Sequence, residues 1–316
     1  MQKIHNPIYG YFGKLPAFND FIKYNAGNNE ILVLDKWLQD GITVCKQKLK
    51  NEWKAVYKNS KRMKFFYPFT GTDKFISGII FPSNDKSDRD FPFLMFCIYE
   101  NYFIGNVPFY LLPLQLNDEF NSFESIYNEV NVNTSLDNLN EQITRVPSSF
   151  QENTVIEKYR KFTDDLTQED FWQRIFDFKE EKKYRLINNI FHPDIKNSRV
   201  ALSFNFYSDD VDNVFDVSFL LNILAVSKNE FFLPAIFWIK DTDNINSLYI
   251  FPSKPNPSDY LDIICSAEDR GRILKVEEDI NLNRDFSSIK DLLQNNEMKL
   301  KEFLQVLNSN LKFGEL

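Results

Sequence analysis

Lys14 follows Gly13 near the start of the chain, a pairing that also occurs in phosphate-binding loops. A Walker loop needs a first glycine five residues before the glycine that precedes the lysine, and a serine or threonine after the lysine to hold magnesium. Here Ile8 and Leu15 occupy those two positions. The flexible backbone and the metal-binding hydroxyl are both missing, so we do not expect a nucleotide-binding loop.

Carboxylates on expected loops are the other residues that could do chemistry. Asp20, Asp85 and Asp88 could share acid–base work, but only if the fold brings two of them together, and the sequence gives no distance. A hydrolase or phosphate-handling enzyme that uses Lys14, Asp20 and Asp85 is therefore one hypothesis. The other is a binding protein without a catalytic site, and we favour it because no catalytic constellation is recognisable.

The segment FPSNDKSDRDFPF (81–93) lies between two apolar runs and predicts a hairpin turn. A calcium loop has acidic residues at alternate positions and a glycine at the sixth. In this segment Lys86 and Arg89 interrupt the aspartates, and no glycine follows. We therefore expect no metal site here and no cofactor.

The three cysteines, Cys45, Cys97 and Cys265, are scattered and stand in apolar surroundings. An odd number without a regular spacing is typical of buried free thiols in a reducing compartment. The first sixteen residues lack the continuous apolar region of a signal peptide. Together these features predict a cytoplasmic protein.

Composition indicates which partners suit the chain. Its formal net charge is −8, which argues against general binding to nucleic acid, because phosphates would be repelled. The same charge argues against docking on an anionic membrane, and the longest apolar runs are far too short to span a bilayer. Hydrophobic residues make up 43% of the 316, and 32 Phe and 14 Tyr predict a large aromatic core.

The elements that must position these side chains follow from hydrophobic periodicity. Residues 29–49 have helical spacing, with Gly41 as a local weakness. Runs rich in β-branched and aromatic residues predict strands at 64–69, 74–83 and 91–100, and the last is apolar on both faces. A helix is expected near residues 118–130.

A polar stretch at 131–153 is the best candidate for a boundary. Beyond it, Thr167 predicts a helix N-cap that accepts from the backbone N–H of Asp170, and Ser258 predicts another cap. The remaining predicted elements are strands at 199–207, 231–240 and 247–253, the last two paired across the turn 241–246, and a C-terminal helix over 286–311. Helices interleaved with apolar strands indicate a layered α/β architecture.

The stretch GYFGKLPAFNDF (10–21) is expected to be a stiff connection from a strand to a helix. Gly13 can adopt backbone conformations closed to other residues, and Pro16 pushes Leu15 into an extended conformation. Asn19 or Asp20 could cap a helix that begins near Phe21.

Three motifs in this order resemble the N-terminal region of TagF, an accessory family of the bacterial type VI secretion system. They are GYFGKLPAFNDFI, LDKWLQDGI and GIIFPSNDKSDRDFPF, and they cover about the first hundred residues. The positions that match the family pattern, and that we take as motif or partner-binding candidates, include Gly13, Lys14, Leu15, Pro16, Asp20, Phe21, Trp37, Leu38, Pro82, Ser83, Asp85, Arg89, Phe91 and Pro92.

The resemblance implies a cytoplasmic protein that represses type VI secretion after translation, in connection with the forkhead-associated scaffold protein of the apparatus. It also implies an α/β three-layer sandwich without known enzymatic activity. We expect residues 1–135 to form the TagF-type domain, a mixed β-sheet with helices on both faces. Residues 136–316 should be an α/β extension that packs on it, since apolar strands need a covering layer.

The two loop motifs are expected to lie side by side and to brace each other through an ion pair between Asp20 and Arg89. In that arrangement Lys14 would be displayed on a stiff loop and left for a partner protein.

Overall fold

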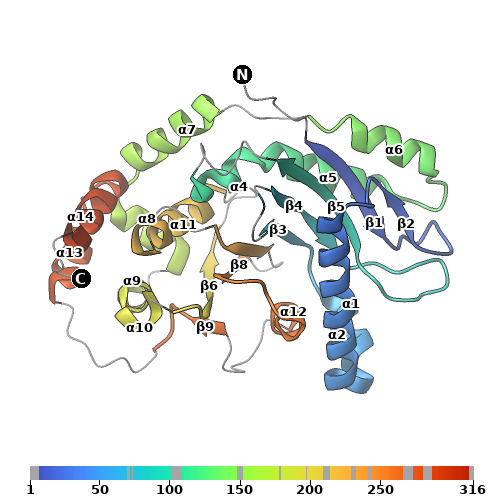
Figure 1. Ribbon diagram of the computed structural model, residues 1–316. Coiled ribbons are helices and arrows are strands. Elements are labelled where there is room, and N and C mark those ends of the chain that lie inside the picture. Colours follow the sequence, from blue (N-terminus) through green and yellow to red (C-terminus); the bar gives the residue numbers. More distant parts are fainter. Residues whose placement is uncertain are drawn as a thin grey trace.

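The computed structural model describes residues 7–69, 72, 74–100, 108–147, 152–177, 179–196, 198–208, 214–228, 233–240, 244–265, 273–279 and 287–312. These residues form a nine-stranded sheet with helices on both faces (Figure 1). The strands are β1 (Ile8–Gly13), β2 (Ile22–Tyr24), β3 (Met63–Pro68), β4 (Lys74–Phe81), β5 (Phe93–Glu100), β6 (Ala201–Tyr207), β7 (Ala235–Lys240), β8 (Ile245–Phe251) and β9 (Ile273–Lys275).

The helices vary from single turns to twenty-one residues. The α-helices are α1 (Asn29–Leu49), α2 (Trp53–Asn59), α4 (Leu112–Gln115), α5 (Asn117–Glu129), α6 (Leu136–Thr144), α7 (Glu152–Asp165), α8 (Gln168–Phe176), α9 (Glu180–Phe191), α10 (Pro193–Lys196), α11 (Val214–Lys228), α12 (Pro257–Ile264), α13 (Ser287–Gln294) and α14 (Leu300–Lys312), with 3₁₀ turns at η1 (Lys50–Glu52) and η2 (Phe109–Leu111). None of these helices combines the length and the hydropathy that crossing a bilayer requires.

The strand order is β2-β1-β5-β4-β3-β7-β8-β6-β9. All neighbours are antiparallel except β6 and β9, which makes the sheet mixed. The pairing of β3 with β7, in register at Phe65 and Phe237, joins strands from before and after residue 135 in one sheet. The expected domain boundary at 135 itself stays a prediction.

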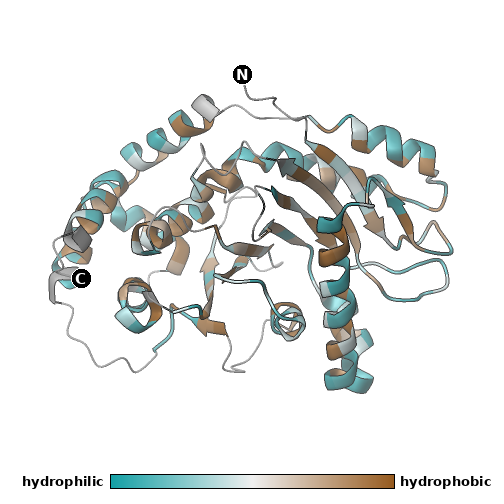
Figure 2. Cartoon of the chain, viewed as in Figure 1, coloured by the Kyte–Doolittle hydropathy of each residue, from teal (hydrophilic) through white to brown (hydrophobic). Residues whose placement is uncertain are grey.

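Strand residues alternate between two hydrophobic cores, as the two-residue period of a strand requires. In β5, Phe93, Met95 and Cys97 belong to the core under the larger helical layer, whereas Leu94, Phe96 and Ile98 belong to the core under α1, α2 and α12. Figure 2 shows the strands as predominantly hydrophobic, while most helices are hydrophilic on one side. The predicted three-layer α/β sandwich is therefore confirmed.

Helix α1 begins and ends where its periodicity predicts. Trp37 lies stacked on Phe237 of β7, edge-on to Tyr260 of α12, and donates to the carbonyl of Asn256 at 3.0 Å. Gly41 allows the two helices this close approach, because a Cβ there would lie 2.7 Å from the Cβ of Tyr260. The glycine that weakens the helical pattern thus has a packing role.

Several local predictions can be compared with the structure. Thr167 does accept from Asp170 N–H, at 3.2 Å. The cap predicted at Ser258 is wrong, because Asn256 is the N-cap of α12 and forms a capping box with Asp259. Cys45 and Cys97 are buried free thiols, as expected, whereas Cys265 is only half-buried.

The C-terminal stretch that was expected as one helix over 286–311 is instead two helices, α13 and α14. The Gln168 side chain accounts for the break, because its amide donates to the carbonyls of Leu292 and Asn295 at 3.1 and 3.0 Å. Its backbone N–H donates to the carbonyl of Met298 at 2.9 Å. Residue 286 and the turn residues 241–243 lie outside the described residues.

Candidate interaction site

The two loop motifs, residues 14–21 and 82–92, lie side by side and are called the loop pair below. Lys86 N–H donates to the carbonyl of Phe18 at 2.9 Å. The guanidinium of Arg89 donates to the carbonyl of Asn19 at 2.6 Å. The expectation that the two motifs lie together is therefore confirmed.

Gly13, at the end of β1, permits this close approach. Its φ is +127°, and a Cβ there would lie 2.1 Å from the carbonyl oxygen of Pro92. No residue with a side chain fits such a position without displacing the neighbouring strand. The second loop has its own left-handed residue, Asp88, at φ +59°, a conformation that aspartate tolerates better than most residues.

Asp85 is the hub of the loop pair. Its carboxylate is inaccessible to solvent and lies 3.0 Å from the ammonium of Lys14 and 2.7 Å from Nε of Arg89. The other carboxylate oxygen accepts from the backbone N–H groups of Ser87 and Arg89, at 2.9 and 3.0 Å. One buried carboxylate thus holds two cations and closes its own turn.

These contacts set the ionisation of Asp85. Burial alone would raise the pKa of its carboxyl, but the hydrogen bonds from Arg89, Lys14 and Ser87 favour the charged form and outweigh burial. The net effect holds the pKa of Asp85 well below its usual range. The group is therefore ionised throughout the neutral range, and its acceptor positions are filled.

The predicted ion pair between Asp20 and Arg89 is wrong. Arg89 pairs with Asp85, four residues earlier in its own loop. Asp20 is exposed and accepts from the N–H of Phe21 at 2.8 Å. No helix begins at Phe21 either, because residues 22–24 form the short strand β2, which pairs with β1.

Lys14 is not displayed for a partner as expected, because only 7% of it is exposed. Its ammonium lies between Asp85 and the ring of Phe21, 5.2 Å from the ring centroid, within reach of a cation–π contact. Buried Leu15 and exposed Pro16 continue the loop from there. The lysine therefore supports the loop pair from within.

Phe21 and Arg89 are among the exposed side chains of the loop pair. Phe21 is 49% exposed and packs edge-on against Phe91, with ring centroids 4.7 Å apart. The side chain of Arg89 is 57% exposed although its guanidinium is held by Asp85 and Asn19. An aromatic ring and an arginine are thus presented in fixed positions beside each other.

Two of the candidate residues stabilise other parts of the fold. Ser83 exchanges hydrogen bonds with the hydroxyl of Tyr57 on α2, whose pKa burial raises strongly. Trp37 of α1 packs against β7 and α12. Sequence reasoning missed Tyr57, because nothing in a helical tyrosine indicates a loop partner.

Residues 10–146 match a family model described as the TagF N-terminal domain, type VI secretion system-associated. Residues 10–146 are a TagF N-terminal domain. The loop pair and α1 therefore lie within a TagF-type domain, and the chain is associated with type VI secretion.

The fold of the chain resembles that of a solved structure. The chain resembles the crystal structure of PA0076 from Pseudomonas aeruginosa PAO1, with a TM-score of 0.52 and 15% sequence identity over 88% of this chain and 99% of that one. No curated protein matches the sequence. Because the likeness covers 88% of this chain, it includes helices and strands that follow residue 146.

The loop pair of the TagF-type domain suits recognition better than acid–base chemistry. A general base needs a free oxygen and a pKa near the working pH, whereas the Asp85 carboxylate is saturated and its pKa is lowered. Neither of two cavities found among the described residues is lined by Lys14, Asp20 or Asp85. Across the same residues, no cluster of His, Cys, Asp and Glu could hold a metal ion.

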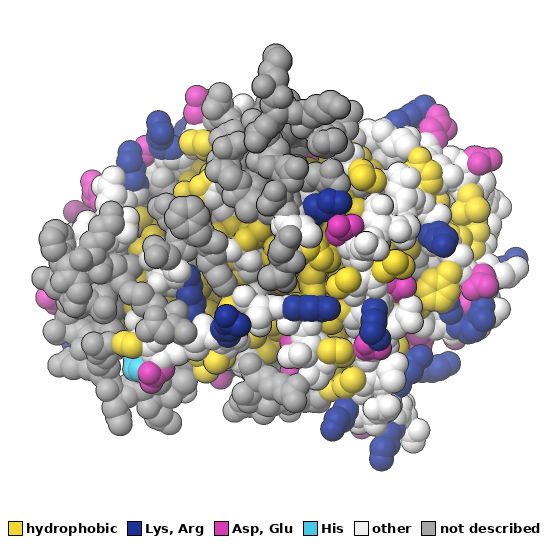
Figure 3. Space-filling view, viewed as in Figure 1, with side chains coloured by type: hydrophobic (Ala, Val, Ile, Leu, Met, Phe, Trp, Pro, Cys, Tyr) yellow, Lys and Arg dark blue, Asp and Glu magenta, His cyan; other side chains and the backbone are white. Residues whose placement is uncertain are grey.

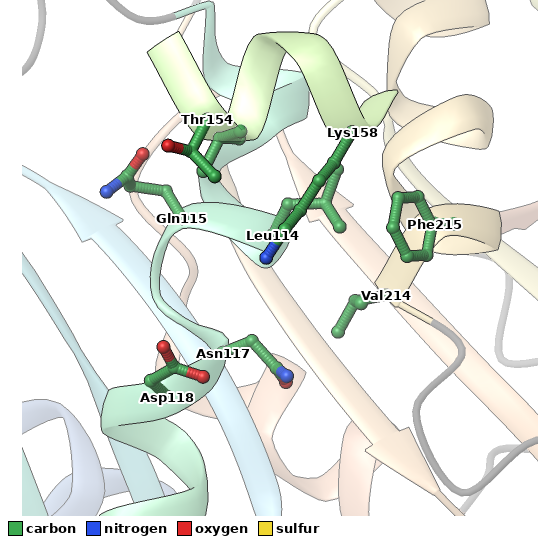
Figure 4. Close-up of a pocket in the computed structure, with 9 residues that line it drawn as sticks. Leu114, Gln115, Asn117, Asp118, Thr154, Lys158, Val214 and Phe215 are labelled. Atoms are coloured by element: carbon green, nitrogen blue, oxygen red, sulfur yellow. The ribbon is translucent and has the colours of Figure 1, made fainter. Parts of the chain in front are cut away.

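The smaller of these cavities, of about 190 Å³, lies where the TagF-type domain meets α7 and α11. Figure 4 shows Lys158 reaching into it from α7, with Asn117 and Asp118 across from it and Phe215 at the side. Lys158 and Asp118 are both exposed, so this cavity is a shallow surface recess.

Proposed function

We propose that this chain is a non-enzymatic, cytoplasmic accessory protein that regulates a bacterial type VI secretion system through protein–protein contacts. In this proposal it represses secretion after translation by binding a component of the apparatus, first of all a forkhead-associated scaffold protein. The TagF-type domain supports the link to the secretion system. The family resemblance of the motifs supports repression and the scaffold partner.

The observation that carries the proposal is the exposure of Phe21 above a rigid support. The ring of Phe21 is 49% exposed to water. Phe91 and the ammonium of Lys14 hold it in place from either side. A ring fixed in this way loses little conformational freedom when a partner covers it.

Arg89 adds a second feature that suits an interface. Aromatic residues and arginine are enriched among the few side chains that dominate binding energy. The Arg89 guanidinium is oriented before binding, because Asp85 and the carbonyl of Asn19 hold it. We therefore place the contact with the secretion component on Phe21 and Arg89.

The test replaces Phe21 by alanine in the chromosomal copy of the native bacterium. Losing an anchor of this kind weakens binding by about 2 kcal/mol, roughly thirtyfold. We expect pull-down with the variant to lose the scaffold protein, and secretion to rise to the level of a deletion strain. Immunoblotting checks that the variant accumulates like the wild type.

Val132→Ala is the matched control, because Val132 is 81% exposed and lies outside the loop pair. This variant should bind and repress normally. A Phe21→Ala variant that still binds and represses would place the contact elsewhere on the molecule. Recovery of no secretion component with the wild type would contradict the regulatory role as a whole.

A further inference from the structure

The larger of the two cavities is a groove of about 980 Å³ on the α1 side of the sheet. It lies where the first turn of α1 meets the end of β3, the start of β7 and the segment after β8. Its volume is at the upper end of the range for sites that bind ligands. Both the TagF-type domain and the later half of the chain contribute walls.

The floor of the groove is apolar and aromatic. Residues of this kind that line it are Val33, Tyr67, Pro68, Phe69, Leu233, Ala235, Phe251 and Pro252. Figure 3 shows the face that carries α1 and α12, where hydrophobic side chains gather near the middle with Lys and Arg around them. Half-buried Phe69 stands beside Tyr67, with ring centroids 5.2 Å apart, so part of the apolar surface is open to a ligand.

Two exposed cations, Arg199 and Lys254, line the groove. Neither makes an ion pair within the part of the chain that the structure describes. A third cation, Lys228, is half-buried and donates to the carbonyls of Ile195 and Ser198 at 2.5 and 3.3 Å. The groove is therefore locally positive in a chain whose net charge is −8.

The acidic residue in the wall does not cancel this charge. Glu30 lies 3.4 Å from the ammonium of Lys74, so the two form a neutral pair. Glu30 belongs to the first turn of α1, whose N-cap residue Asn28 makes no capping hydrogen bond through its side chain. The first N–H groups of a helix that lacks such a cap also favour negative charge.

A buried hydroxyl in the floor points the same way. Tyr67 is 2% exposed, and its hydroxyl has no hydrogen-bond partner among the described residues. Burial raises the pKa of this hydroxyl to about 12, so it stays protonated. Buried polar groups nearly always have partners, so a polar ligand atom at this wall would complete the site.

We infer that the groove binds a linear peptide segment of a partner protein in which acidic side chains alternate with apolar ones. Arg199 precedes β6 and Lys254 follows β8, so the two cations lie on different segments of the groove wall, and a ligand with two acidic groups can meet both. The aromatic floor requires apolar side chains between them. A single small anion supplies only one of these features, and a nucleic acid would be repelled by the rest of this acidic chain.

The inference is tested with purified full-length protein by fluorescence anisotropy. The probe is a pool of labelled hexapeptides in which Asp or Glu alternates with Phe or Leu. Removing both cations in the double variant Arg199→Ala and Lys254→Ala should weaken binding at least about tenfold. The double variant Lys54→Ala and Lys58→Ala removes two exposed charges from α2, outside the groove, and should change binding less than about twofold.

Four results would overturn the inference. Equal weakening in both double variants would show only general attraction by charge. Equal binding of a second pool with Ser in place of Phe and Leu, or tighter binding of a single-stranded oligonucleotide, would identify a different class of ligand. No binding of the first pool at about 1 mM would leave the groove without this function. The assay measures the groove directly, so its outcome is independent of the secretion experiment at Phe21.

Discussion

The loop pair and the groove both gather cations in an acidic chain, but they satisfy them differently. In the loop pair, Lys14 and Arg89 share the buried carboxylate of Asp85. In the groove, Arg199 and Lys254 have no acidic partner among the described residues. The charges of the loop pair therefore stabilise the fold, whereas those of the groove remain available to a ligand.

This difference explains why motif matching alone does not locate a ligand site. Lys14, Asp85 and Arg89 of the motifs are engaged with one another, and beside them an aromatic ring and an oriented guanidinium are exposed. The groove takes its residues from segments far apart in sequence, and no motif marks them. The ion pairs of the loop pair thus hold Phe21 and Arg89 in place, whereas the cations of the groove are left for a ligand. Each assignment can be tested by substitution.

The largest effect is expected for Asp85→Ala. The substitution leaves Lys14 almost fully buried without its counter-charge and removes the acceptor for the N–H groups of Ser87 and Arg89. We expect the melting temperature to fall by about 5 °C or more. Circular dichroism at neutral pH measures it.

Asp20→Ala is the matched control for that change, because Asp20 is exposed and forms no ion pair within the described residues. Its melting temperature should stay within about 1 °C of the wild type. Equal losses in the two variants would mean that Asp85 is not the hub of the loop pair.

The ionisation of Asp85 gives a second, smaller effect that depends on pH. Because its pKa is lowered in the folded state, the unfolded chain binds the proton more readily, and stability rises with pH in this range. The contribution is complete above the unfolded value of about 3.9 and is lost as the pH falls below it.

Urea unfolding of the wild type and of Asp85→Asn between pH 3 and pH 7 isolates this contribution. The amide cannot ionise, so the difference in stability between the two proteins should shrink as the pH falls below about 4. Other carboxyl groups titrate equally in both proteins and cancel in the comparison. A difference that stayed constant with pH would show that the charge of Asp85 does not matter to folding.

Much of the fold could be predicted from sequence, because its signals are local. The helix over 29–49 and the strands of the hairpin 74–100 follow from apolar spacing, and the structure places them within two residues. The cap at Asn256 was missed because Ser258 offers an equally suitable side chain two residues later. Only the structure shows which of them meets the N–H of the third helical residue.

The site was harder to predict, because pairing depends on geometry across the sheet. Sequence indicated that the two loops lie together, but Asp20 and Asp85 are chemically identical candidates for Arg89. The turn from Asp85 to Arg89 decides between them, since it brings both the backbone N–H and the Nε of Arg89 to the carboxylate of Asp85. The groove was not predicted at all, because its walls come from both halves of the chain.

The smallest effect on stability is expected for the double variant Arg199→Ala and Lys254→Ala. Both side chains are exposed and unpaired among the described residues, so their removal breaks no ion pair and uncovers no core. Loss of two exposed charges of this kind changes the melting temperature by less than about 1 °C. The same variant should lose peptide binding, so a large effect on binding would accompany almost none on folding. A fall in melting temperature comparable to that of Asp85→Ala would show instead that these cations are structural, and the contrast between the loop pair and the groove would fail.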